Sequence, residues 1–513
     1  MALGWVLFIL VLCFWGVHVS LKNEEIEALR RQHQRCLAGE ERLKKQNKIR
    51  DDEITQFHIR VQNAQNTIQL QQQQLAHLNR LSSLQLENPE MFRALRLIKQ
   101  GKHVFIHGRA GTGKSFFIKN YLKPGIPQAA YVAPTNMAAL NIGGLTIHRF
   151  LAANVNTITR PFHTWSDAKQ QEAYHNLQYI KTLVIDEISM VHSELLDWID
   201  KRLREMKQTN TPFGGLQVVF IGDLYQLPPV ENNPDKRKTR YPFCAQVYKQ
   251  IEVCFIEFNK MYRQQDPVFS EALSVIRTAD TRLLAQVVHY FNVHCPHGSP
   301  ENVPCFYPIR RMVESKNKTE LAKLPGPSYL NEAEKHGYWG ENNAQDTRYP
   351  APEYLEIKIG APVIFLANVD NFYVNSDVGI IKEISTTSLG NITGISVYNA
   401  RTKRVVCVVK YTWFQKRINA KGEIEDDLEV WYKQFPIQLA YALTIHKAQG
   451  LTLDRACINF GASTFDDGQA YTALSRVKTL PGLYLGKNIK PGDIKVSQEV
   501  RRFLQQQHGG ILL

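Results

Sequence analysis

Residues 108–115 have the composition and order of a phosphate-binding loop. An apolar run at 104–106 precedes a glycine-rich segment that ends in Gly-Lys-Ser, and residues that can begin a helix follow it. Glycines let backbone N–H groups approach phosphate oxygens, and a helix N-terminus adds partial positive charge. Lys114 would contact the β- and γ-phosphates of ATP, and the Ser115 hydroxyl would bind Mg²⁺. The residues predicted to bind ATP are Gly108, Arg109, Ala110, Gly111, Thr112, Gly113, Lys114 and Ser115.

Two adjacent carboxylates form the second half of this predicted site. Asp186 and Glu187 directly follow the apolar run 182–185, which predicts a strand. Asp186 can hold Mg²⁺ through water, and Glu187 can orient and activate the attacking water. An Asp-Glu pair often simply ends a strand, but downstream of a phosphate-binding loop it is the expected partner. The two segments together predict an ATP hydrolase.

Length, charge and cysteine usage bound the protein class. With 513 residues the chain is too long for one core, which indicates two or three folded units. Lys and Arg total 62 against 48 Asp and Glu, and this excess favours a polyanionic partner, either nucleic acid or an anionic membrane surface. The cysteines form no C-x-x-C pair, so we expect reduced thiols. A zinc site could be drawn from one cluster, although its spacing matches no standard pattern. Its members are His294, Cys295, His297 and Cys305.

The N-terminal segment predicts a membrane anchor. Residues 2–21 carry no charge if His18 is neutral, and about 20 apolar residues can span a bilayer as a helix. A cleaved signal peptide is the alternative, but a basic n-region and a clear cleavage site are missing. Basic residues flank only the C-terminal side of the run. The positive-inside rule therefore predicts a single-pass membrane protein with its N-terminus outside and the rest of the chain in the cytosol.

Residues 22–82 predict a coiled-coil stalk. Apolar residues recur at the a and d heptad positions between Ile26 and Leu78, with interruptions such as His33 and Asn47. Two such helices would bury this seam between them, which favours a homodimer. A single solvated helix or a disordered segment is the alternative.

Further segments carry uncommon residue patterns. They are 187–191, 211–217 with Pro-Phe-Gly-Gly, 222–230 with Gln-Leu-Pro-Pro-Val, 258–264, 444–454 and 468–476. In residue type, order and spacing these segments resemble the motifs of the Pif (petite integration frequency) family of superfamily 1 DNA helicases. The resemblance covers roughly residues 88–490.

The resemblance implies catalytic roles for four side chains. Glu187 would activate water, and Gln226 would sense the γ-phosphate and couple it to DNA. Arg263 and Arg476 would neutralise charge on the transferring phosphoryl group from across the cleft. Because the two arginines would come from different domains, hydrolysis would depend on closure of the cleft. Such arginines accelerate hydrolysis ~10³- to 10⁵-fold in other NTPases.

The resemblance also implies contacts to a single strand of DNA. In the family, the motifs that hold the predicted DNA-binding residues lie along that strand, and short polar side chains suit contacts to phosphate and sugar. Two aromatic residues nearby, Phe150 and Tyr471, could stack on bases or belong to the core. The predicted DNA-binding residues are Thr135, His148, His446 and Gln449.

One position departs from the family. A glutamine that contacts the adenine edge is usual about ten residues before a glycine equivalent to Gly101, and Met91 stands there. A thioether cannot form the bidentate hydrogen bond that an amide forms with adenine. Selectivity for ATP over other nucleotides is therefore in doubt.

The expected fold is α/β, with two RecA-like P-loop NTPase lobes that each contain a parallel sheet flanked by helices. We expect the first lobe at 88–280, a connection at 281–307 and the second lobe at 308–513. Alternating apolar and polar runs at about 380–432 predict antiparallel strands, and the resemblance implies a small inserted β-barrel there.

These observations predict a membrane-anchored, ATP-dependent DNA helicase that uses ATP and Mg²⁺ and acts on single-stranded and duplex DNA. The resemblance implies 5′ to 3′ movement and a role in DNA replication, recombination or repair. The alternatives are a membrane-to-DNA tether with a vestigial motor, an RNA helicase of a replication complex, and a soluble nuclear or cytosolic protein.

Overall fold

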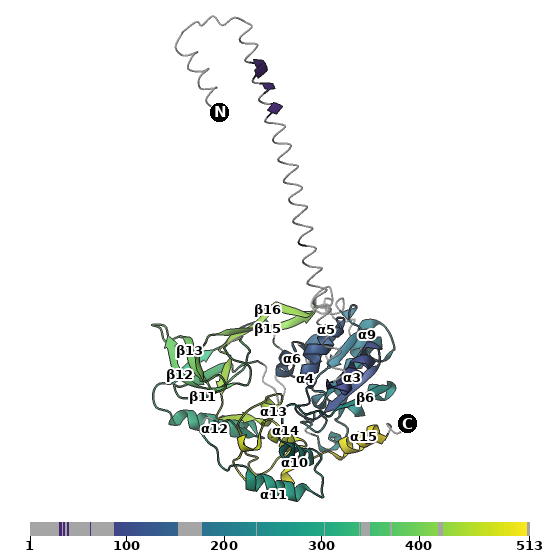
Figure 1. Cartoon of the computed structure of the whole chain (residues 1–513), viewed down its shortest axis with the longest axis vertical. Coiled ribbons are helices and arrows are strands. Elements are labelled where there is room, and N and C mark those ends of the chain that lie inside the picture. The colour runs from purple at the N-terminus through teal and green to yellow at the C-terminus, as the bar shows by residue number, and fades with distance from the viewer. Residues whose placement is uncertain are drawn as a thin grey trace, which may run out of the picture. The chain divides into compact units, whose positions relative to one another are not determined.

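The structure, a computed structural model, describes residues 87–509 except 152–176, 232, 302, 338, 340–348, 370–371 and 419–423 (Figure 1). Before residue 87 it describes only scattered helical positions, 30–32, 34–35, 38–39 and 62. The predicted anchor at 1–21 lies outside the described residues, as does almost all of the predicted stalk at 22–82. The contacts between residues divide the chain into two compact units, 1–86 and 87–513. The second unit contains the residues predicted to bind ATP.

The predicted localisation is corrected. We expected a single-pass membrane protein, but among the residues that the structure describes no helix is long and apolar enough to cross a membrane. The prediction rested on the apolar composition and length of residues 2–21 and on the basic residues that follow them.

The first lobe is built on a six-stranded parallel sheet. Its strands are β1 (His103–Gly108), β2 (Ala129–Ala133), β3 (Leu145–Thr146), β4 (Thr182–Ile185), β5 (Gln217–Gly222) and β6 (Val253–Phe258), in the order β3-β2-β4-β5-β1-β6. The strands are apolar and mostly buried because helices cover a parallel sheet on its faces. The helices of this lobe include α3 (Pro89–Lys99), α6 (Asn136–Ile142), α7 (Ile147–Phe150) and α9 (Ser193–Lys207). Since parallel strands share an end, the phosphate-binding loop after β1 and the carboxylates after β4 lie at one edge of the sheet.

The second lobe contains a smaller parallel sheet in the order β18-β7-β19-β20. Its strands are β18 (Ala442–Thr444), β7 (Cys305–Tyr307), β19 (Ala456–Ile458) and β20 (Leu483–Leu485), and α12 (Arg310–Lys323), α13 (Ile445–Ala448) and α14 (Gln469–Leu474) accompany them. The two parallel sheets agree with the expected α/β fold of two lobes.

Antiparallel strands are inserted between α12 and β18. A five-stranded sheet has the order β14 (Arg404–Val408), β13 (Ile392–Asn399), β12 (Val378–Thr386), β11 (Pro362–Phe365) and β17 (Ile437–Leu439). A second sheet joins β15 (Tyr411–Ile418), β16 (Ile424–Gln434) and β9 (Glu334–His336), and β8 (Tyr329–Glu332) pairs with β10 (Tyr354–Ile357). The inserted strands thus extend on both sides of the expected range 380–432.

The β15–β16 hairpin returns to the first lobe. Arg149 on α7 donates hydrogen bonds to the carbonyl oxygen of Lys416 and to the side chain of Gln415 on β15. It also forms an ion pair with Asp427 on β16. The hairpin therefore connects the insertion directly to the first lobe.

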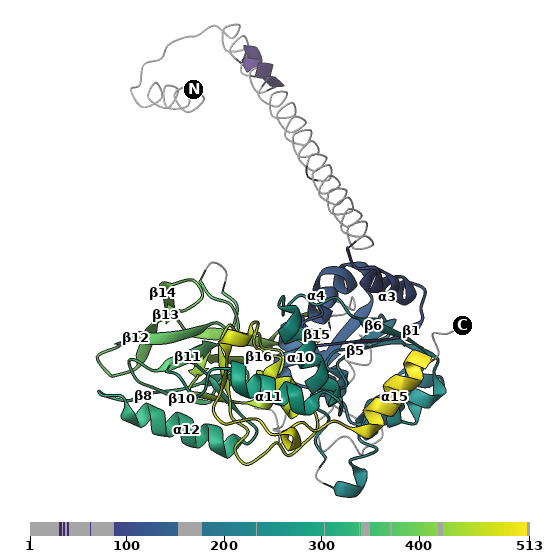
Figure 2. The ribbon, with the colours of Figure 1, turned by 60° about the horizontal axis from the view of Figure 1, so that its bottom comes forward.

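Helices cross the expected boundary between the lobes. The core of the second lobe includes Phe269, Ala272, Leu273 and Ile276 of α10 (Pro267–Thr278) and Val288 and Phe291 of α11 (Leu284–His294), although we expected α10 in the first lobe and α11 in a connection. Arg277 of α10 instead pairs with Asp223 of the first lobe. Conversely, α15 (Gln498–Gly509) places Val500, Phe503 and Leu504 in the core of the first lobe. Phe503 stacks on Phe243 with ring centroids 4.3 Å apart, and Figure 2 shows α15 in yellow beside the first-lobe strands.

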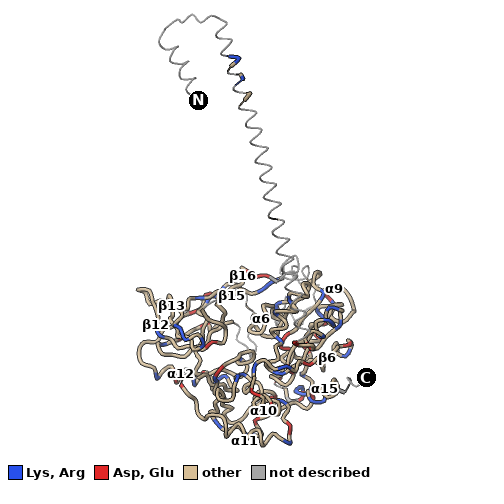
Figure 3. Tube along the Cα trace, in the orientation of Figure 1, with Lys and Arg blue, Asp and Glu red and all other residues tan. Residues whose placement is uncertain are grey.

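Basic and acidic residues are scattered over both lobes and the insertion (Figure 3). The formal net charge of the whole chain is +14.

Candidate functional site

The phosphate-binding loop joins β1 to the short helix α4 (Lys114–Phe117). Gly111 and Gly113 have φ angles of 92° and 84°, in the left-handed region that favours glycine. The ammonium group of Lys114 donates hydrogen bonds to the carbonyl oxygens of Gly108 and Arg109, at 2.7 Å and 2.9 Å. The lysine is thus held against the loop that would cradle phosphate.

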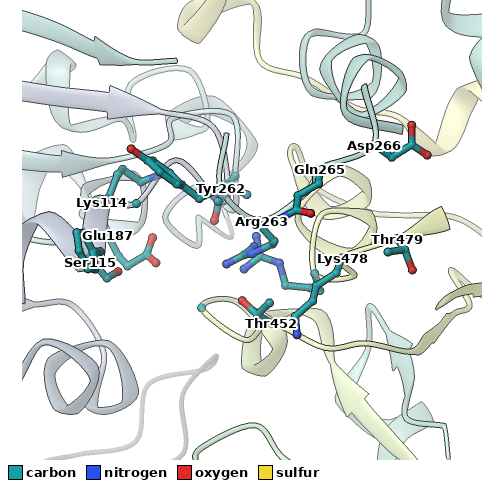
Figure 4. Close-up of a pocket in the computed structure, with 17 residues that line it drawn as sticks. Lys114, Ser115, Glu187, Tyr262, Arg263, Gln265, Asp266, Thr452, Lys478 and Thr479 are labelled. Atoms are coloured by element: carbon teal, nitrogen blue, oxygen red, sulfur yellow. The ribbon is translucent and has the colours of Figure 1, made fainter. Parts of the chain in front are cut away.

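A cavity of about 650 Å³ opens beside this loop. We call it the nucleotide cavity, and both lobes line it (Figure 4). Figure 4 shows Lys114 and Glu187 on one side, Lys478 on the other and Arg263 between them. Of the residues predicted to bind ATP, the cavity is lined by Ala110, Gly111, Gly113, Lys114 and Ser115.

The other predicted loop residues lie behind the cavity wall. Thr112 is fully buried and its hydroxyl donates to the carbonyl of Arg109 at 2.9 Å. A Cβ on Gly108 would approach the Thr112 hydroxyl to 2.7 Å and the Phe258 carbonyl to 2.9 Å. Thr112 and Gly108 therefore shape the loop, and neither they nor Arg109 line the nucleotide cavity.

The two carboxylates differ in their surroundings. Asp186 is 5% exposed, and burial together with the charge of Glu187 raises its pKa. Asp186 and Ser115 both line the second cavity described below. Carboxylate and hydroxyl oxygens are the ligands that Mg²⁺ prefers, and a divalent cation would stabilise a buried carboxylate as its anion. The residues present therefore fit a magnesium ion.

Glu187 holds an uncommon backbone conformation. Its φ angle is 49°, in the left-handed region, and it precedes the 3₁₀ turn η4 (Ile188–Met190). Non-glycine residues in this region are uncommon and cluster at functional sites. The side chain lines both the nucleotide cavity and the second cavity.

Two arginines complete the wall of the nucleotide cavity. Arg476 comes from the second lobe, but Arg263 follows β6 of the first lobe and lies beside the phosphate-binding loop, since a Cβ on Gly111 would come within 2.5 Å of the Arg263 Cβ; the expectation that Arg263 acts from across the cleft is therefore corrected. Arg263 donates to the carbonyl of Ser475 at 3.1 Å, and Arg476 donates to the carbonyl of Thr472 at 2.8 Å. Burial, followed by the nearby charge of Arg476, lowers the pKa of Arg263 to about 9. Burial also lowers the pKa of Arg476, while Glu187 opposes this shift. The structure brings both predicted arginines to the nucleotide cavity, where an anionic ligand would relieve their mutual repulsion.

Gln226 also lines the nucleotide cavity and is 5% exposed. Its backbone lies against the second lobe: a Cβ on Gly468 would come within 2.3 Å of the Gln226 carbonyl oxygen. The predicted γ-phosphate sensor therefore occupies the boundary between the lobes.

A tyrosine that the sequence left ambiguous links the lobes. The hydroxyl of Tyr471 accepts a hydrogen bond from the Ala110 N–H at 2.9 Å and donates to Asp223 at 3.1 Å. Asp223 is buried, and Arg277 lies 3.1 Å from it. Tyr471 and Phe150 are 3% and 5% exposed, so neither ring is available to stack on a base.

A second cavity of about 330 Å³ adjoins the first and shares Ser115, Glu187, Gly450 and Thr452 with it. Of the predicted DNA-binding residues, Thr135, His446 and Gln449 line the second cavity. Burial lowers the pKa of His446, which favours the neutral ring.

His148 is the exception. It lies outside the second cavity's wall and stacks on Trp198 of α9, with ring centroids 6.2 Å apart. Burial lowers its pKa.

The second cavity also contains residues that we did not predict. Asn368, Asn375 and Ser376 come from a loop of the insertion, and Asn141 comes from α6. The Asn375 amide donates to the Asn141 side chain at 3.4 Å, and Ser376 has a φ angle of 79°. The sequence Asn-Ser-Asp at 375–377 is typical of a turn, and this pattern could have indicated the loop that supplies these residues.

Met91 packs against the phosphate-binding loop. It is 1% exposed, and its terminal methyl group would lie 2.9 Å from a Cβ on Gly113. The neighbouring amide of Asn88 is already engaged, because it accepts from the Met91 N–H and donates to the Tyr262 hydroxyl at 3.0 Å. Neither Met91 nor Asn88 therefore offers a free amide that could bind the adenine base.

The proposed zinc cluster is not supported. Across the described part of the chain, no group of three or more His, Cys, Asp or Glu side chains could hold a metal ion. Cys305 instead lies beside Cys457 on β19, with their sulfur atoms 3.2 Å apart.

Comparison with known proteins gives consistent matches. The family model described as PIF1-like helicase matches residues 84–278. The ATP-dependent DNA helicase PIF1 of Danio rerio is 30% identical over 424 residues, which are 81% of this chain and 63% of that protein. The ATP-dependent DNA helicase Pif1 of Bdellovibrio bacteriovorus is 29% identical over 426 residues, covering 82% of this chain and 92% of that protein.

Solved structures of Pif1 proteins also match this chain. Bacteroides sp Pif1 in complex with ADP-AlF4 is 28% identical with a TM-score of 0.70, over 82% of this chain and 97% of that chain. Bacteroides Pif1 bound to ssDNA is 30% identical with a TM-score of 0.60, over 82% and 97% of the two chains.

Proposed function

The chain belongs to the family of PIF1-like helicases, and from this we propose that it is an ATP-dependent DNA helicase that moves along single-stranded DNA. The single observation that carries the proposal is the nucleotide cavity, in which a phosphate-binding loop from one lobe faces Arg476 from the other. Closing and opening of such a cleft with each ATP can move two lobes along a strand.

The proposed hydrolysis is an in-line displacement at the γ-phosphorus of ATP. Glu187 orients the attacking water and accepts its proton as the new oxygen–phosphorus bond forms. The bond from the γ-phosphorus to the β–γ bridging oxygen breaks, and ADP and inorganic phosphate leave. Lys114, Arg263 and Arg476 neutralise the negative charge that spreads over the phosphoryl oxygens.

We propose Mg²⁺ as the cofactor, held by Ser115 and, through water, by Asp186. Bound there, Mg²⁺ would neutralise part of the negative charge of the nucleotide phosphates. Ser115 lines both cavities. Its hydroxyl would bind the ion beside the nucleotide phosphates.

We propose that the second cavity holds part of the single strand. Its wall offers amide, hydroxyl and imidazole groups together with the cations Lys119 and Lys447, which suit contacts to phosphate and sugar without dependence on sequence. The carboxylates Asp186 and Glu187 lie where this cavity adjoins the nucleotide cavity. Movement in the 5′ to 3′ direction, the inserted β-barrel and a homodimer through the stalk at 22–82 are further parts of the proposal, and they rest on the sequence resemblance and the heptad pattern.

An unwinding assay with the full chain tests the proposal. Duplex DNA with a 5′ or a 3′ single-stranded tail is incubated with ATP and Mg²⁺, beside a Lys114→Ala variant. We expect unwinding only from the 5′ tail and none with the variant. Unwinding from the 3′ tail would reverse the direction, and equal activity of the variant would show that the proposed site is not responsible.

A further inference from the structure

Gln449 connects the two cavities. Its side-chain amide donates a hydrogen bond to a carboxylate oxygen of Glu187 at 2.9 Å. Gln449 comes from the second lobe and lines the second cavity, whereas Glu187 comes from the first lobe and lines both. Of the four residues that the cavities share, Glu187 alone has an ionisable side chain.

The backbone at Gln449 is well anchored, so the side chain is the part that can move. Thr444 caps the N-terminus of α13, and Gln449 ends this helix with its N–H donated to the His446 carbonyl. Gly450 follows with a φ angle of 83°, which turns the chain away. A change at Gln449 therefore means rotation of its side chain.

The amide is only half satisfied where it lies. Its nitrogen bonds to Glu187, while its oxygen is buried and finds no hydrogen-bond partner among the described residues. A buried acceptor without a partner is costly, so the present orientation is easier to leave than a fully bonded one. Rotation toward the second cavity would release that cost.

The hydrogen bond occupies the group that the proposed reaction needs. Glu187 must present a carboxylate oxygen to the attacking water, and the Gln449 amide uses one of these oxygens. It also joins this carboxylate to the second lobe. The contact therefore restrains Glu187 in a direction set by the other lobe.

We propose that Gln449 is a latch on Glu187 that makes ATP hydrolysis depend on the DNA strand; the proposal rests on the function proposed above. While the amide donates to Glu187, hydrolysis is slow. A strand in the second cavity offers phosphate and sugar oxygens to the same amide, draws it away and frees the carboxylate to orient water. Gln449 is thus a positioning residue that acts through Glu187.

The test measures ATP hydrolysis by the full chain with Mg²⁺, with and without an oligothymidylate. Gln449→Met keeps the length of the side chain and removes its N–H groups. We expect the rate constant kcat without DNA to rise about tenfold, the size of a lost hydrogen bond to a charged group. The KM for ATP and the kcat with DNA should stay near the wild-type values, so the stimulation by DNA falls.

Gln286→Met is the matched control. Gln286 is exposed on α11 of the second lobe and lines neither cavity. The latch predicts that kcat without DNA rises for the Gln449 variant and stays unchanged for this one. An equal rise in both would overturn the latch, because loss of any glutamine amide on the second lobe would then suffice.

A second variant covers the case in which Gln449→Met does not fold, as judged by thermal unfolding. Gln449→Asn keeps an amide but shortens it by one methylene group, and the same rise in DNA-free kcat is expected. If the wild type is stimulated by DNA and neither folded variant shows the rise, the latch is wrong and the proposed function stands. If the wild type is not stimulated, the proposed function fails and the latch with it.

Discussion

The two cavities share a wall but are built differently. The nucleotide cavity is lined by short motif segments, and its charged groups converge on one place: Lys114, Glu187, Arg263 and Arg476. The second cavity is lined mainly by amides, hydroxyls and apolar side chains, many of them from loops far apart in the sequence. The second cavity also has four charged residues, Lys119, Asp186, Glu187 and Lys447, so the two cavities differ in proportion. Charge dominates the cavity that fits a triphosphate, whereas neutral polar groups outnumber charges in the cavity proposed to hold the strand.

The largest effect that this comparison predicts is at the nucleotide cavity. Arg476→Ala should lower kcat for ATP hydrolysis about 10³-fold, because the buried charge that faces the phosphoryl group is lost. The affinity for the DNA strand should change little. Steady-state ATPase rates and fluorescence anisotropy with a labelled oligonucleotide measure the two quantities.

Arg455→Ala is the control for this variant. Arg455 is exposed on the same lobe and donates to the Tyr484 hydroxyl at 2.6 Å. Its kcat should equal that of the wild type. A similar loss in both variants would mean that removal of any positive charge from the second lobe slows the enzyme.

A smaller effect is expected where the second lobe meets the phosphate-binding loop. Tyr471→Phe removes the hydroxyl that joins Ala110 to Asp223 and leaves both groups buried. Loss of one partner in such a network costs about 1–3 kcal/mol, so the free energy of unfolding in urea should fall by that amount. A variant as stable as the wild type would indicate that water replaces the hydroxyl.

The second cavity should respond more weakly. Asn375→Ala removes an amide whose oxygen finds no partner in the described part of the chain. If this oxygen and its amide contact the strand, the DNA concentration for half-maximal ATPase stimulation should rise about fivefold. The KM for ATP should not change.

Asn391→Ala serves as the control for Asn375→Ala, because Asn391 is exposed in a turn of the same insertion. A raised KM for ATP in the Asn375 variant alone would contradict the separation between the two cavities.

The smallest effect concerns the support of α6, which lines the second cavity. Lys123 donates to the Gly143 carbonyl at the end of α6, and burial, followed by the charges of Lys416 and Lys119, lowers its pKa to about 8. The unfolded chain keeps this proton to higher pH than the folded chain does, so the free energy of unfolding gains a contribution as pH rises from about 8 to 10.

Urea unfolding at pH 7.5 and pH 9.5 checks this prediction. Lys123→Met should lack the gain, so the difference in stability between variant and wild type should change between the two pH values. A constant difference would show that Lys123 keeps its usual pKa in the folded protein.

Sequence reasoning was most successful where function is encoded in neighbouring residues. The phosphate-binding loop and the Asp186-Glu187 pair each follow an apolar strand, and parallel strands bring their ends together. The part of the site that these two segments form was therefore predictable from the sequence. Arg263 and Arg476 were located only through the family resemblance, because nothing local distinguishes them from surface arginines.

The second cavity was harder to predict. Asn141 and Asn375 meet through the arrangement of the lobe and the insertion, which no periodicity describes. Gln449 was expected at DNA, and its bond to Glu187 depends on how the lobes face each other. The position of α15 illustrates the same limit: an amphipathic pattern predicts that one face is buried, but not against which lobe.

The return of α15 to the first lobe has a consequence for how the lobes can move. The second lobe is joined to the first before α10 and again before α15, so the chain passes between them twice. Two covalent connections restrict the relative motion of the lobes more than one connection would. A fluorophore on α15 would therefore move with the first lobe, although α15 follows the second lobe in sequence. To measure closure of the cleft, the second fluorophore must be attached to the second lobe, before α15.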